Sequence, residues 1–119
     1  MTIQRLLKPK LLELATYYPV TVITGPRQSG KTTLSREAFP DKSYVSLEPI
    51  DMRSYALEDP RGFLDEYQNG AIIDEVQHAP ELLSYLQDFV DQNPEPGRFI
   101  LTGSQNLILS QSIAQSMAG

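Results

Sequence analysis

The chain has 119 residues, of which 40% are hydrophobic and 21% charged, and its formal net charge at pH 7 is −5. This length suits one domain with a modest core. The absence of cysteine and the single histidine exclude a disulfide framework and a structural zinc site, so a cytoplasmic location is expected. There is no apolar run long enough to cross a bilayer and no signal-peptide pattern, so no membrane partner is expected.

Charge is distributed unevenly along the chain. Residues 1–42 carry seven Lys and Arg against three Asp and Glu, a net of +4, whereas residues 43–119 carry three against twelve, a net of −9. A solvated acidic surface explains this pattern, and so does a basic phosphate site followed by an acidic metal site. Because nucleic-acid affinity rests on neutralising phosphates, direct nucleic-acid binding by this segment is disfavoured.

The first half of the chain predicts two helices and two strands. Apolar residues recur on one helical face over residues 2–15, and Pro9 within this segment predicts a kinked or broken helix. The β-branched segment 19–24 predicts a buried strand, and residues 30–38 predict a helix. Residues 43–48 predict a second strand.

The second half continues the alternation of helices and strands. Asp51 is expected to cap a short helix and Pro60 to begin another turn. Residues 71–75 predict a third strand, residues 80–90 an amphipathic helix, and residues 98–103 a fourth strand. Four strands alternating with helical segments predict an α/β sandwich with a parallel sheet.

The segment GPRQSGKTT, residues 25–33, matches the phosphate-binding pattern G-x-x-x-x-G-K-[ST] between a predicted strand and a predicted helix. Its glycines allow backbone N–H groups to curl around phosphate oxygens, and the following helix directs its positive end at the same phosphates. Lys31 is expected to neutralise the β- and γ-phosphates, and Thr32 to ligate Mg²⁺. The alternative is an ordinary glycine turn. The predicted nucleotide-binding residues are Gly25, Pro26, Arg27, Gln28, Ser29, Gly30, Lys31, Thr32 and Thr33.

Asp74 and Glu75 end the apolar segment AIIDE. Acidic residues are common at strand ends, so this pattern alone is a weak signal. Downstream of a phosphate-binding loop, however, it predicts that Asp74 holds Mg²⁺ through water and that Glu75 acts as the catalytic group that polarises the attacking water. The adjacent pair favours an ATP hydrolase over a small-molecule kinase.

The segment LTGS, residues 101–104, ends the fourth strand. In the additional-strand P-loop arrangement, this strand lies between two others: the strand that precedes the glycine loop and the strand that ends in the acidic pair. A polar side chain here can contact the γ-phosphate or the attacking water. Ser104 is the first candidate for this catalytic role and Thr102 the second, Gln105 and Asn106 stay open, and a plain turn of small polar residues is the alternative.

Five further polar residues have less defined expectations. Gln77 follows the acidic pair closely enough to face the nucleotide, whereas His78 is expected at the surface. Arg27 is expected to face solvent or a neighbouring subunit. Arg53 and Arg98 suggest no role from the sequence alone.

Several segments together resemble the AAA-type domain of a widespread group of bacterial and archaeal ATPases, and the similarity extends over essentially the whole chain. They are GPRQSGKTTL, SLE, DPRGFL, AIIDEVQHAPELLSYLQ and RFILTGSQN, in this order and spacing. Members of this group resemble AAA+ and signal-transduction (STAND-like) ATPases and usually continue into a C-terminal domain with a nuclease-like fold. The resemblance implies Mg-ATP binding at Gly25, Gly30, Lys31 and Thr32, with Asp74 and Glu75 as the Walker B pair.

The sequence departs from this family after its last two residues, Ala118 and Gly119. Family members continue with an arginine, a further strand and the second domain. We therefore expect residues 1–119 to form a P-loop NTPase three-layer sandwich of about four parallel strands, incomplete at its C-terminus before a fifth strand. Without a downstream arginine, hydrolysis is expected to be weakened more than ATP binding, since the phosphate contacts are local.

Three functional hypotheses follow from these patterns. The first is a P-loop ATPase domain that binds Mg-ATP and hydrolyses it at the β–γ bond to drive or regulate a C-terminal or partner module. The second is a regulatory switch that binds ATP or ADP without turnover. The third is a small-molecule kinase. Homo-oligomerisation stays open.

Overall fold

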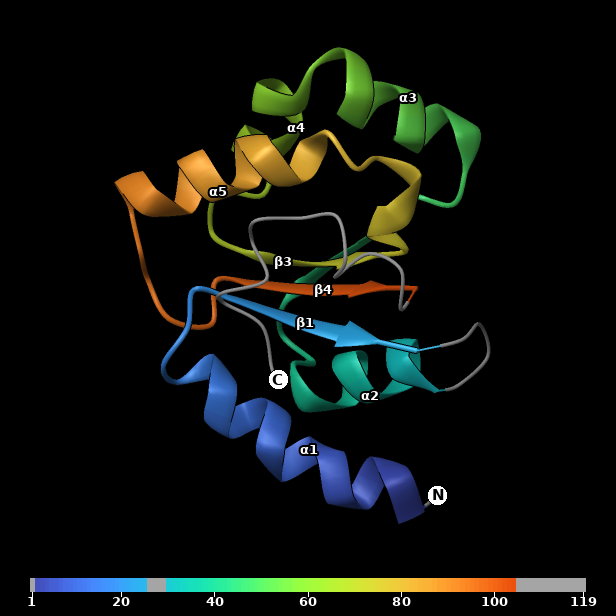
Figure 1. Ribbon diagram of the computed structural model, residues 1–119, viewed down its shortest axis with the longest axis vertical. Coiled ribbons are helices and arrows are strands. Elements are labelled where there is room, and N and C mark those ends of the chain that lie inside the picture. Colours follow the sequence, from blue (N-terminus) through green and yellow to red (C-terminus); the bar gives the residue numbers. More distant parts are fainter. Residues whose placement is uncertain (1, 26–29, 105–119) are drawn as a thin grey trace.

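The structure is a computed structural model that describes residues 2–25 and 30–104 (Figure 1). Within these residues a single parallel sheet has the strand order β1-β4-β3-β2. The predicted parallel sheet is confirmed, and β4 lies between β1 and β3 as the additional-strand arrangement requires. The strands are β1 (Val20–Thr24), β2 (Ser43–Ser46), β3 (Ala71–Asp74) and β4 (Phe99–Gly103).

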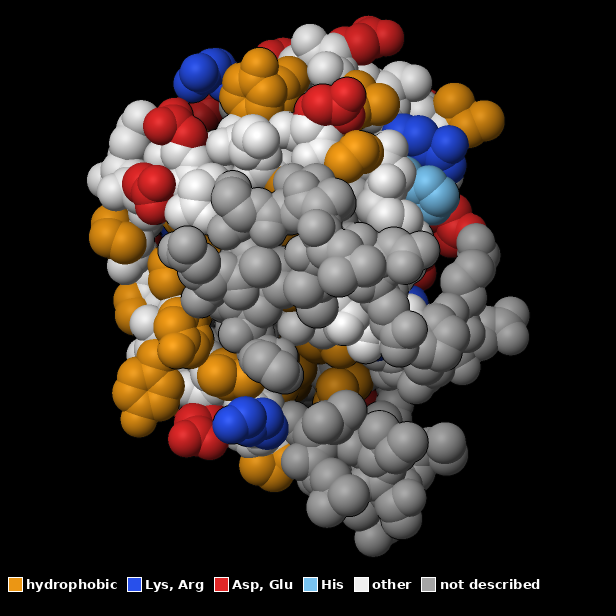
Figure 2. Space-filling view, in the orientation of Figure 1, with side chains coloured by type: hydrophobic (Ala, Val, Ile, Leu, Met, Phe, Trp, Pro, Cys, Tyr) orange, Lys and Arg blue, Asp and Glu red, His pale blue; other side chains and the backbone are white. Residues whose placement is uncertain are grey.

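Helices cover both faces of the sheet and make the predicted three-layer sandwich (Figure 1). One face carries α1 (Thr2–Ala15) and α2 (Lys31–Ala38), which also contact each other. The other face carries α3 (Ile50–Glu58), α4 (Pro60–Glu66) and α5 (Leu82–Gln92). A short 3₁₀ turn, η1 (Val76–His78), follows β3. Figure 2 shows many of the acidic side chains over the α3–α5 layer.

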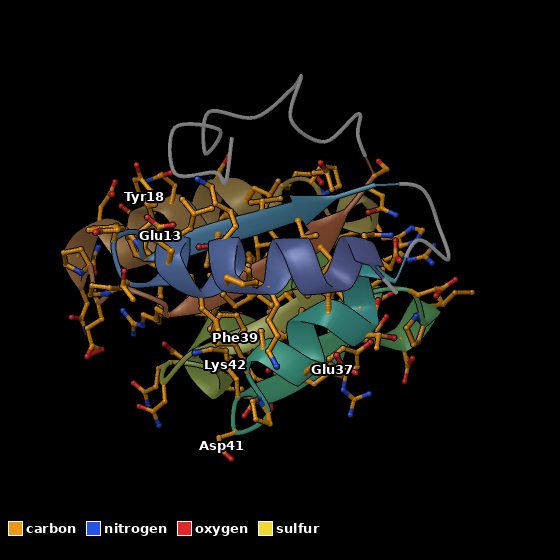
Figure 3. All side chains as sticks on the ribbon, turned by 90° about the horizontal axis from the view of Figure 1, so that it is seen from below. Glu13, Tyr18, Glu37, Phe39, Asp41 and Lys42 are labelled. Atoms are coloured by element: carbon orange, nitrogen blue, oxygen red, sulfur yellow. The ribbon has the colours of Figure 1, made fainter. Side chains whose placement is uncertain are left out.

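Two apolar clusters flank the sheet because successive side chains of a strand point to opposite faces. Ile73 and Leu101 face the larger cluster under α3–α5, whereas Ile72 and Ile100 face the smaller one under α1 and α2. Figure 3 is a view onto the face of the sheet that α1 and α2 cover, with Phe39 at the end of α2. Burial on both faces explains why β3 and β4 are mainly apolar, whereas β2 at the sheet edge is half polar.

Two helices refine the sequence predictions. A single helix runs from Thr2 to Ala15 with Pro9 inside it, so the predicted helix is confirmed but is not broken there. Asp51 does not cap α3, because the helix begins one residue earlier and Pro49 occupies the N-cap position. Asp51 instead lies in the first turn, where a carboxylate is favoured by the helix dipole.

The remaining helices begin as local chemistry dictates. Asp59 caps α4 by accepting a hydrogen bond from Gly62 N at 3.1 Å, and Pro60 is the first helical residue as predicted. The helix α5 begins at Leu82 rather than at Pro80. The preceding turn is closed by Leu83 N, which donates to Pro80 O at 3.1 Å.

Arg98 fastens two loops at the amino ends of the strands. Its buried guanidinium donates to the backbone oxygen of Gln68 at 2.9 and 2.6 Å and to that of Asn93 at 2.7 Å. The same group lies over the ring of Phe89, 4.7 Å from its centroid. Arg98 therefore has a structural role that the sequence did not suggest.

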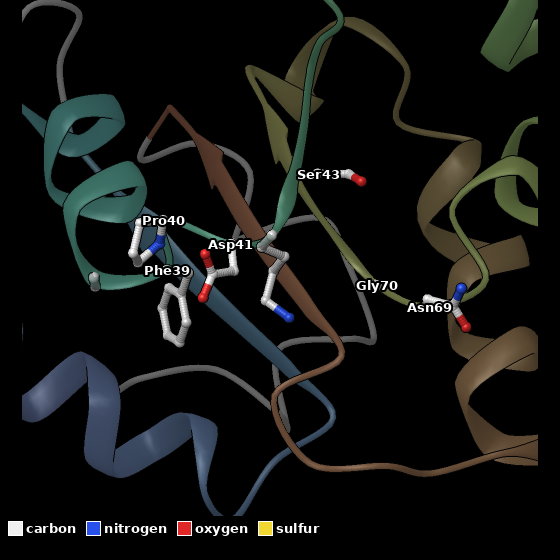
Figure 4. A pocket seen from close by; sticks show the side chains of 8 residues that line it. Phe39, Pro40, Asp41, Ser43, Asn69 and Gly70 are labelled. Carbon is white, nitrogen blue, oxygen red and sulfur yellow. The ribbon is translucent and has the colours of Figure 1, made fainter.

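A surface hollow of about 390 Å³ lies at this same end of the sheet (Figure 4). Its lining includes Phe39, Asp41, Lys42 and Asn69. The half-buried Lys42 donates to Gly97 O at 2.7 Å, and burial lowers the pKa of its ammonium group. Since β2 and β3 begin here and Asp74 ends β3, the hollow is at the opposite end from the acidic pair.

Candidate nucleotide and metal site

The sequence-predicted site residues meet at the carboxyl ends of the strands. Thr24 ends β1, Asp74 ends β3 and Gly103 ends β4, and all three strands are parallel, so the segments that follow them share one edge of the sheet. Ligands of open α/β sheets bind at this edge. Pro26, Arg27, Gln28, Ser29, Gln105 and Asn106 lie outside the described residues.

Gly25 and Gly30 are the two glycines of the phosphate-loop pattern, and the backbone has a defined arrangement at each of them. Gly25 N donates to Gly103 O at 3.2 Å, which ties the end of β1 to the end of β4. Gly30 has φ 89° and ψ 4°, a left-handed conformation that favours glycine, and it is the N-cap of α2. The helix consequently begins at Lys31 and directs its first N–H groups to the edge where the strands end.

Lys31 and Glu75 form a buried ion pair between α2 and the end of β3. Lys31 Nζ lies 3.6 Å from Glu75 Oε2, and the two side chains are only 4% and 10% exposed. The other carboxylate oxygen, Glu75 Oε1, accepts a hydrogen bond from Gln77 Nε2 at 2.7 Å. Because a charge in a dry site needs a partner, the ammonium of Lys31 and the carboxylate of Glu75 compensate each other here.

Asp74 accepts hydrogen bonds from three hydroxyl groups. Thr32 Oγ1 lies 2.9 Å from Asp74 Oδ1 and 3.1 Å from Oδ2, so the residue after Lys31 contacts the end of β3 directly. Tyr44 OH donates to Asp74 Oδ2 at 2.8 Å, and Thr102 Oγ1 donates to Asp74 Oδ1. These partners come from α2, β2 and β4, and together they fix the plane of a carboxylate that is 5% exposed.

Thr102 connects the two acidic residues. Besides its bond to Asp74, its hydroxyl oxygen accepts a hydrogen bond from the backbone N–H of Glu75 at 3.0 Å. The residue is completely buried. Thr102 was the second candidate for contact with a γ-phosphate, and its hydroxyl is instead engaged with Asp74 and Glu75.

Gln77 lies next to Glu75, and Ser104 lies next to Gln77. Ser104 N donates to Gln77 Oε1 at 3.2 Å, while the amide nitrogen of Gln77 donates to Glu75. The side chain of Gln77 thus links the segment leaving β4 to the carboxylate of Glu75. Contact of Ser104 with a γ-phosphate, and of Gln77 with a nucleotide, stay predictions.

Glu75 has a strained backbone. Its φ of 59° and ψ of 50° place it in the left-handed region, where non-glycine residues are uncommon, and it is the single non-glycine residue with positive φ in the described part of the chain. Such a conformation costs about 1–3 kcal/mol and persists where the surroundings impose it, often at functional sites. Here it turns the chain sharply after β3 and brings the carboxylate toward Lys31.

Tyr44 beside Asp74 and Arg36 beside Tyr44 are two residues that the sequence patterns did not predict. Tyr44 is half-buried, and burial together with the hydrogen bond to Asp74 raises the pKa of its phenol to about 12. The guanidinium carbon of Arg36 lies 4.4 Å from the centroid of the Tyr44 ring. The one available signal was the alternation of β2, which places Tyr44 on the same face of the sheet as Ile72.

Three other residues singled out from the sequence lie around the site. Thr33 is exposed on α2. His78 is half-buried rather than at the surface, and its Nε2 has no hydrogen-bond partner among the described residues. Arg53 braces the turn after β2 by donating to Leu47 O at 3.4 Å and Glu48 O at 2.6 Å.

The side chains at this site suit Mg²⁺ better than they suit a metal ion whose ligands all come from the protein. No group of three or more His, Cys, Asp or Glu residues that could hold an ion occurs in the described ranges. Mg²⁺ usually keeps several waters and takes one or two carboxylates together with substrate phosphates. A hydroxyl from Thr32 and a carboxylate from Asp74, hydrogen-bonded at 2.9 Å beside the start of α2, fit that pattern.

Fold and site together define the chain as an α/β domain of the P-loop NTPase type. The sequence profile of the family described as "AAA domain" matches residues 17–119, and the chain belongs to this family. It is accordingly a domain with a nucleotide-binding, ATPase-like function, as the sequence resemblance implied. Among the residues described, no helix is both long and apolar enough to span a bilayer.

Two curated relatives match the greater part of the chain. The uncharacterized proteins Rv2008c of Mycobacterium tuberculosis and Mb2031c of Mycobacterium bovis are each 38% identical over 104 residues. The alignment covers 85% of this chain and 23% of either relative. The chain therefore spans about a quarter of the length of the curated relatives it matches.

Proposed function

We propose that this chain is an ATP-hydrolysing domain that binds Mg-ATP at the carboxyl ends of β1, β3 and β4. Breakage of the β–γ bond would drive or regulate a C-terminal or partner module. The observation that carries the proposal is the double pairing of α2 with β3: Lys31 with Glu75, and Thr32 with Asp74. Consecutive residues of the glycine-loop helix thereby meet consecutive acidic residues at one strand end.

The binding step uses charge and the start of α2. Lys31 would exchange its contact with Glu75 for the β- and γ-phosphates, joined by the backbone N–H groups after Gly30. Thr32 and Asp74 would hold Mg²⁺, Thr32 through its oxygen and Asp74 through water. The hydroxyl proton of Thr32 already points to Asp74, so a lone pair of the same oxygen stays available for a cation. When bound, Mg²⁺ supplies neutralisation of phosphate charge.

The hydrolytic step uses Glu75. Once Lys31 turns to phosphate, the Glu75 carboxylate is released to orient and deprotonate a water molecule that attacks the γ-phosphorus. The P–O bond to the bridging oxygen breaks, and ADP and phosphate leave. Gln77 holds one oxygen of Glu75 at 2.7 Å and Thr102 holds its backbone, so the carboxylate is oriented before substrate arrives. Ser104 stays a candidate for contact with the γ-phosphate.

A regulatory switch without turnover is the second candidate. Its supporting observation is the Lys31–Glu75 pair, which holds the proposed catalytic carboxylate against the proposed phosphate-binding lysine. A chain in which that carboxylate never reaches water would bind ATP and change state without hydrolysing it.

Steady-state ATP turnover separates the two candidates. Turnover would be measured for the chain and for a longer natural protein that contains it, each with Glu75→Gln and with Glu37→Gln on the exposed side of α2 as the matched control. The ATPase proposal predicts turnover that falls at least 100-fold in Glu75→Gln and is unchanged in Glu37→Gln. Tight Mg-ATP binding without Glu75-dependent turnover in either protein eliminates hydrolysis and leaves the switch, and a phosphorylated acceptor would instead indicate a kinase.

A further inference from the structure

Of the three hydroxyl groups on Asp74, that of Tyr44 is the one that lies outside every segment in which the sequence predicted site residues. Tyr44 lies in the middle of β2, directly opposite Ile72 in the parallel register, and Asp74 follows two residues later on the same face of β3. A tyrosine is long enough to reach this diagonal neighbour, and its OH lies 2.8 Å from Asp74 Oδ2. Since the acceptor is a carboxylate with little exposure, this is a charge-assisted hydrogen bond.

The Tyr44 ring is itself held from α2. Arg36 places its guanidinium carbon 4.4 Å from the ring centroid, within the range of a cation–π contact. Arg36 lies four residues after Thr32, so the two side chains leave α2 on the same side. Thr32 contacts Asp74, Asp74 contacts Tyr44, and Tyr44 contacts Arg36. The contacts form a closed loop that joins α2, β3 and β2.

Two donors on opposite oxygens decide how the carboxylate is turned. Thr102 donates to Oδ1 and Tyr44 to Oδ2, and Thr32 lies within hydrogen-bond distance of both. Without Tyr44, Oδ2 would keep just the shared contact with Thr32 among the described residues, and the carboxylate could rotate about its bond to Cβ. A group that binds a cation loses affinity when its orientation is no longer fixed, and removal of such supporting hydrogen bonds typically costs 10–100-fold.

We propose that Tyr44 is a positioning residue for the magnesium-binding carboxylate of Asp74, and that Arg36 keeps the tyrosine ring in place. The inference rests on the proposed function of the site. It assigns to β2 a part in metal binding that neither acidic nor glycine-loop motif contains. Tyr44 itself does not touch the metal or the nucleotide.

The test uses Tyr44→Phe, which keeps the ring and its stacking with Arg36 and removes only the hydroxyl. The affinity of the chain for a fluorescent ATP analogue is measured first in EDTA and then at a series of Mg²⁺ concentrations. The readout is the half-saturating Mg²⁺, the concentration that gives half of the magnesium-dependent increase in affinity. We expect Tyr44→Phe to raise that concentration about 10-fold, while affinity in EDTA stays within about 2-fold of wild type. Thermal melting without nucleotide checks that the variant is folded.

Two further variants complete the test. Tyr55→Phe is the matched control, because Tyr55 OH donates to the Glu66 carboxylate between α3 and α4 on the other face of the sheet, and its half-saturating Mg²⁺ should equal wild type. Arg36→Met keeps apolar contact with the ring but removes the charge, and it should move half-saturation in the direction of Tyr44→Phe by a smaller factor. Arg36→Met therefore tests whether the placement of the Tyr44 ring matters while the Tyr44 hydroxyl is kept.

The failures are distinguishable. If wild type shows no magnesium-dependent increase in nucleotide affinity, the proposed function fails and this inference falls with it. If wild type shows the increase and Tyr44→Phe has the same half-saturating Mg²⁺, only the positioning role is overturned. An equal loss of affinity with and without Mg²⁺ in Tyr44→Phe also overturns it, because a general structural defect would do that.

Discussion

Replacing Thr102 by valine removes one hydroxyl from the centre of the proposed site and changes the side-chain volume little. Two groups would be affected at once: Asp74 Oδ1 would keep Thr32 but lose the donor Thr102, and the backbone N–H of Glu75 would lose the hydroxyl to which it donates at 3.0 Å. Thr102 is completely buried, so water cannot replace the lost bonds without opening the sheet edge.

The structure gives the size of the effect. A hydrogen bond to a charged group contributes about 1.5–3 kcal/mol, and a buried donor left without a partner costs about 1–3 kcal/mol. We therefore expect Thr102→Val to lower the free energy of unfolding by about 3–4 kcal/mol, which is a large part of the usual 5–15 kcal/mol of a domain. For a chain of this size, that loss corresponds to a fall in Tm of about 10–15 °C.

Urea unfolding followed by circular dichroism measures this difference, with two controls. Thr102→Ser keeps the hydroxyl and loses one methyl, so it should cost only about 1 kcal/mol. Thr21→Val removes an equally buried hydroxyl from β1 that has no hydrogen-bond partner among the described residues, and its stability should stay level or rise. If Thr102→Val costs no more than Thr102→Ser, the bridging role of this hydroxyl is refuted.

Three further predictions concern loops, strain and ionisation. Arg98→Leu should lower the free energy of unfolding by about 2–3 kcal/mol in urea, because Gln68 O and Asn93 O lose a charged donor; a loss below about 0.5 kcal/mol contradicts the role of Arg98. Glu75→Gly should be about 1 kcal/mol more stable than Glu75→Ala, since only glycine is at ease with φ 59°; equal stabilities would argue against the strained backbone. The pKa of Tyr44 is raised from 10.0 to about 12, so the stability contributed by its protonated phenol is present below pH 10 and is lost as pH rises toward 12. Urea midpoints between pH 9 and 11.5 should fall less steeply for Tyr44→Phe than for wild type, and identical slopes would count against the contact with Asp74.

The parts of the fold that could be predicted from the sequence are those with strong local signals. The glycine loop between a β-branched strand and a helix located β1 and the start of α2, and the apolar segment ending in two carboxylates located β3. Alternating strands and helices predicted the parallel sheet. The helix around Asp51 was displaced because Pro49 supplies the N-cap position, and proline gives no capping side chain to recognise.

The contacts around Asp74 could not be predicted, because they join residues far apart in the sequence. Tyr44 reaches Asp74 from the neighbouring strand, and Arg36 reaches Tyr44 from a helix, so neither contact leaves a pattern of spacing in the sequence. The inward orientation of Thr102 follows from strand alternation with the buried Ile100, but only once the faces of β4 are known. The left-handed backbone of Glu75 has no sequence signal, since glycine or asparagine would be expected there.

The central claim is that the start of α2 and the end of β3 form a Mg-ATP site, and equilibrium ATP binding to wild type and Lys31→Ala tests it most directly. Calorimetric titrations with and without Mg²⁺ would use Lys42→Ala as the control, because Lys42 lies at the opposite end of the sheet beside Gly97. The account predicts ATP binding that Mg²⁺ strengthens, that Lys31→Ala weakens at least 100-fold, and that Lys42→Ala leaves unchanged. Nucleotide affinity unaltered by Lys31→Ala, or no ATP binding by the folded wild-type chain, would contradict it.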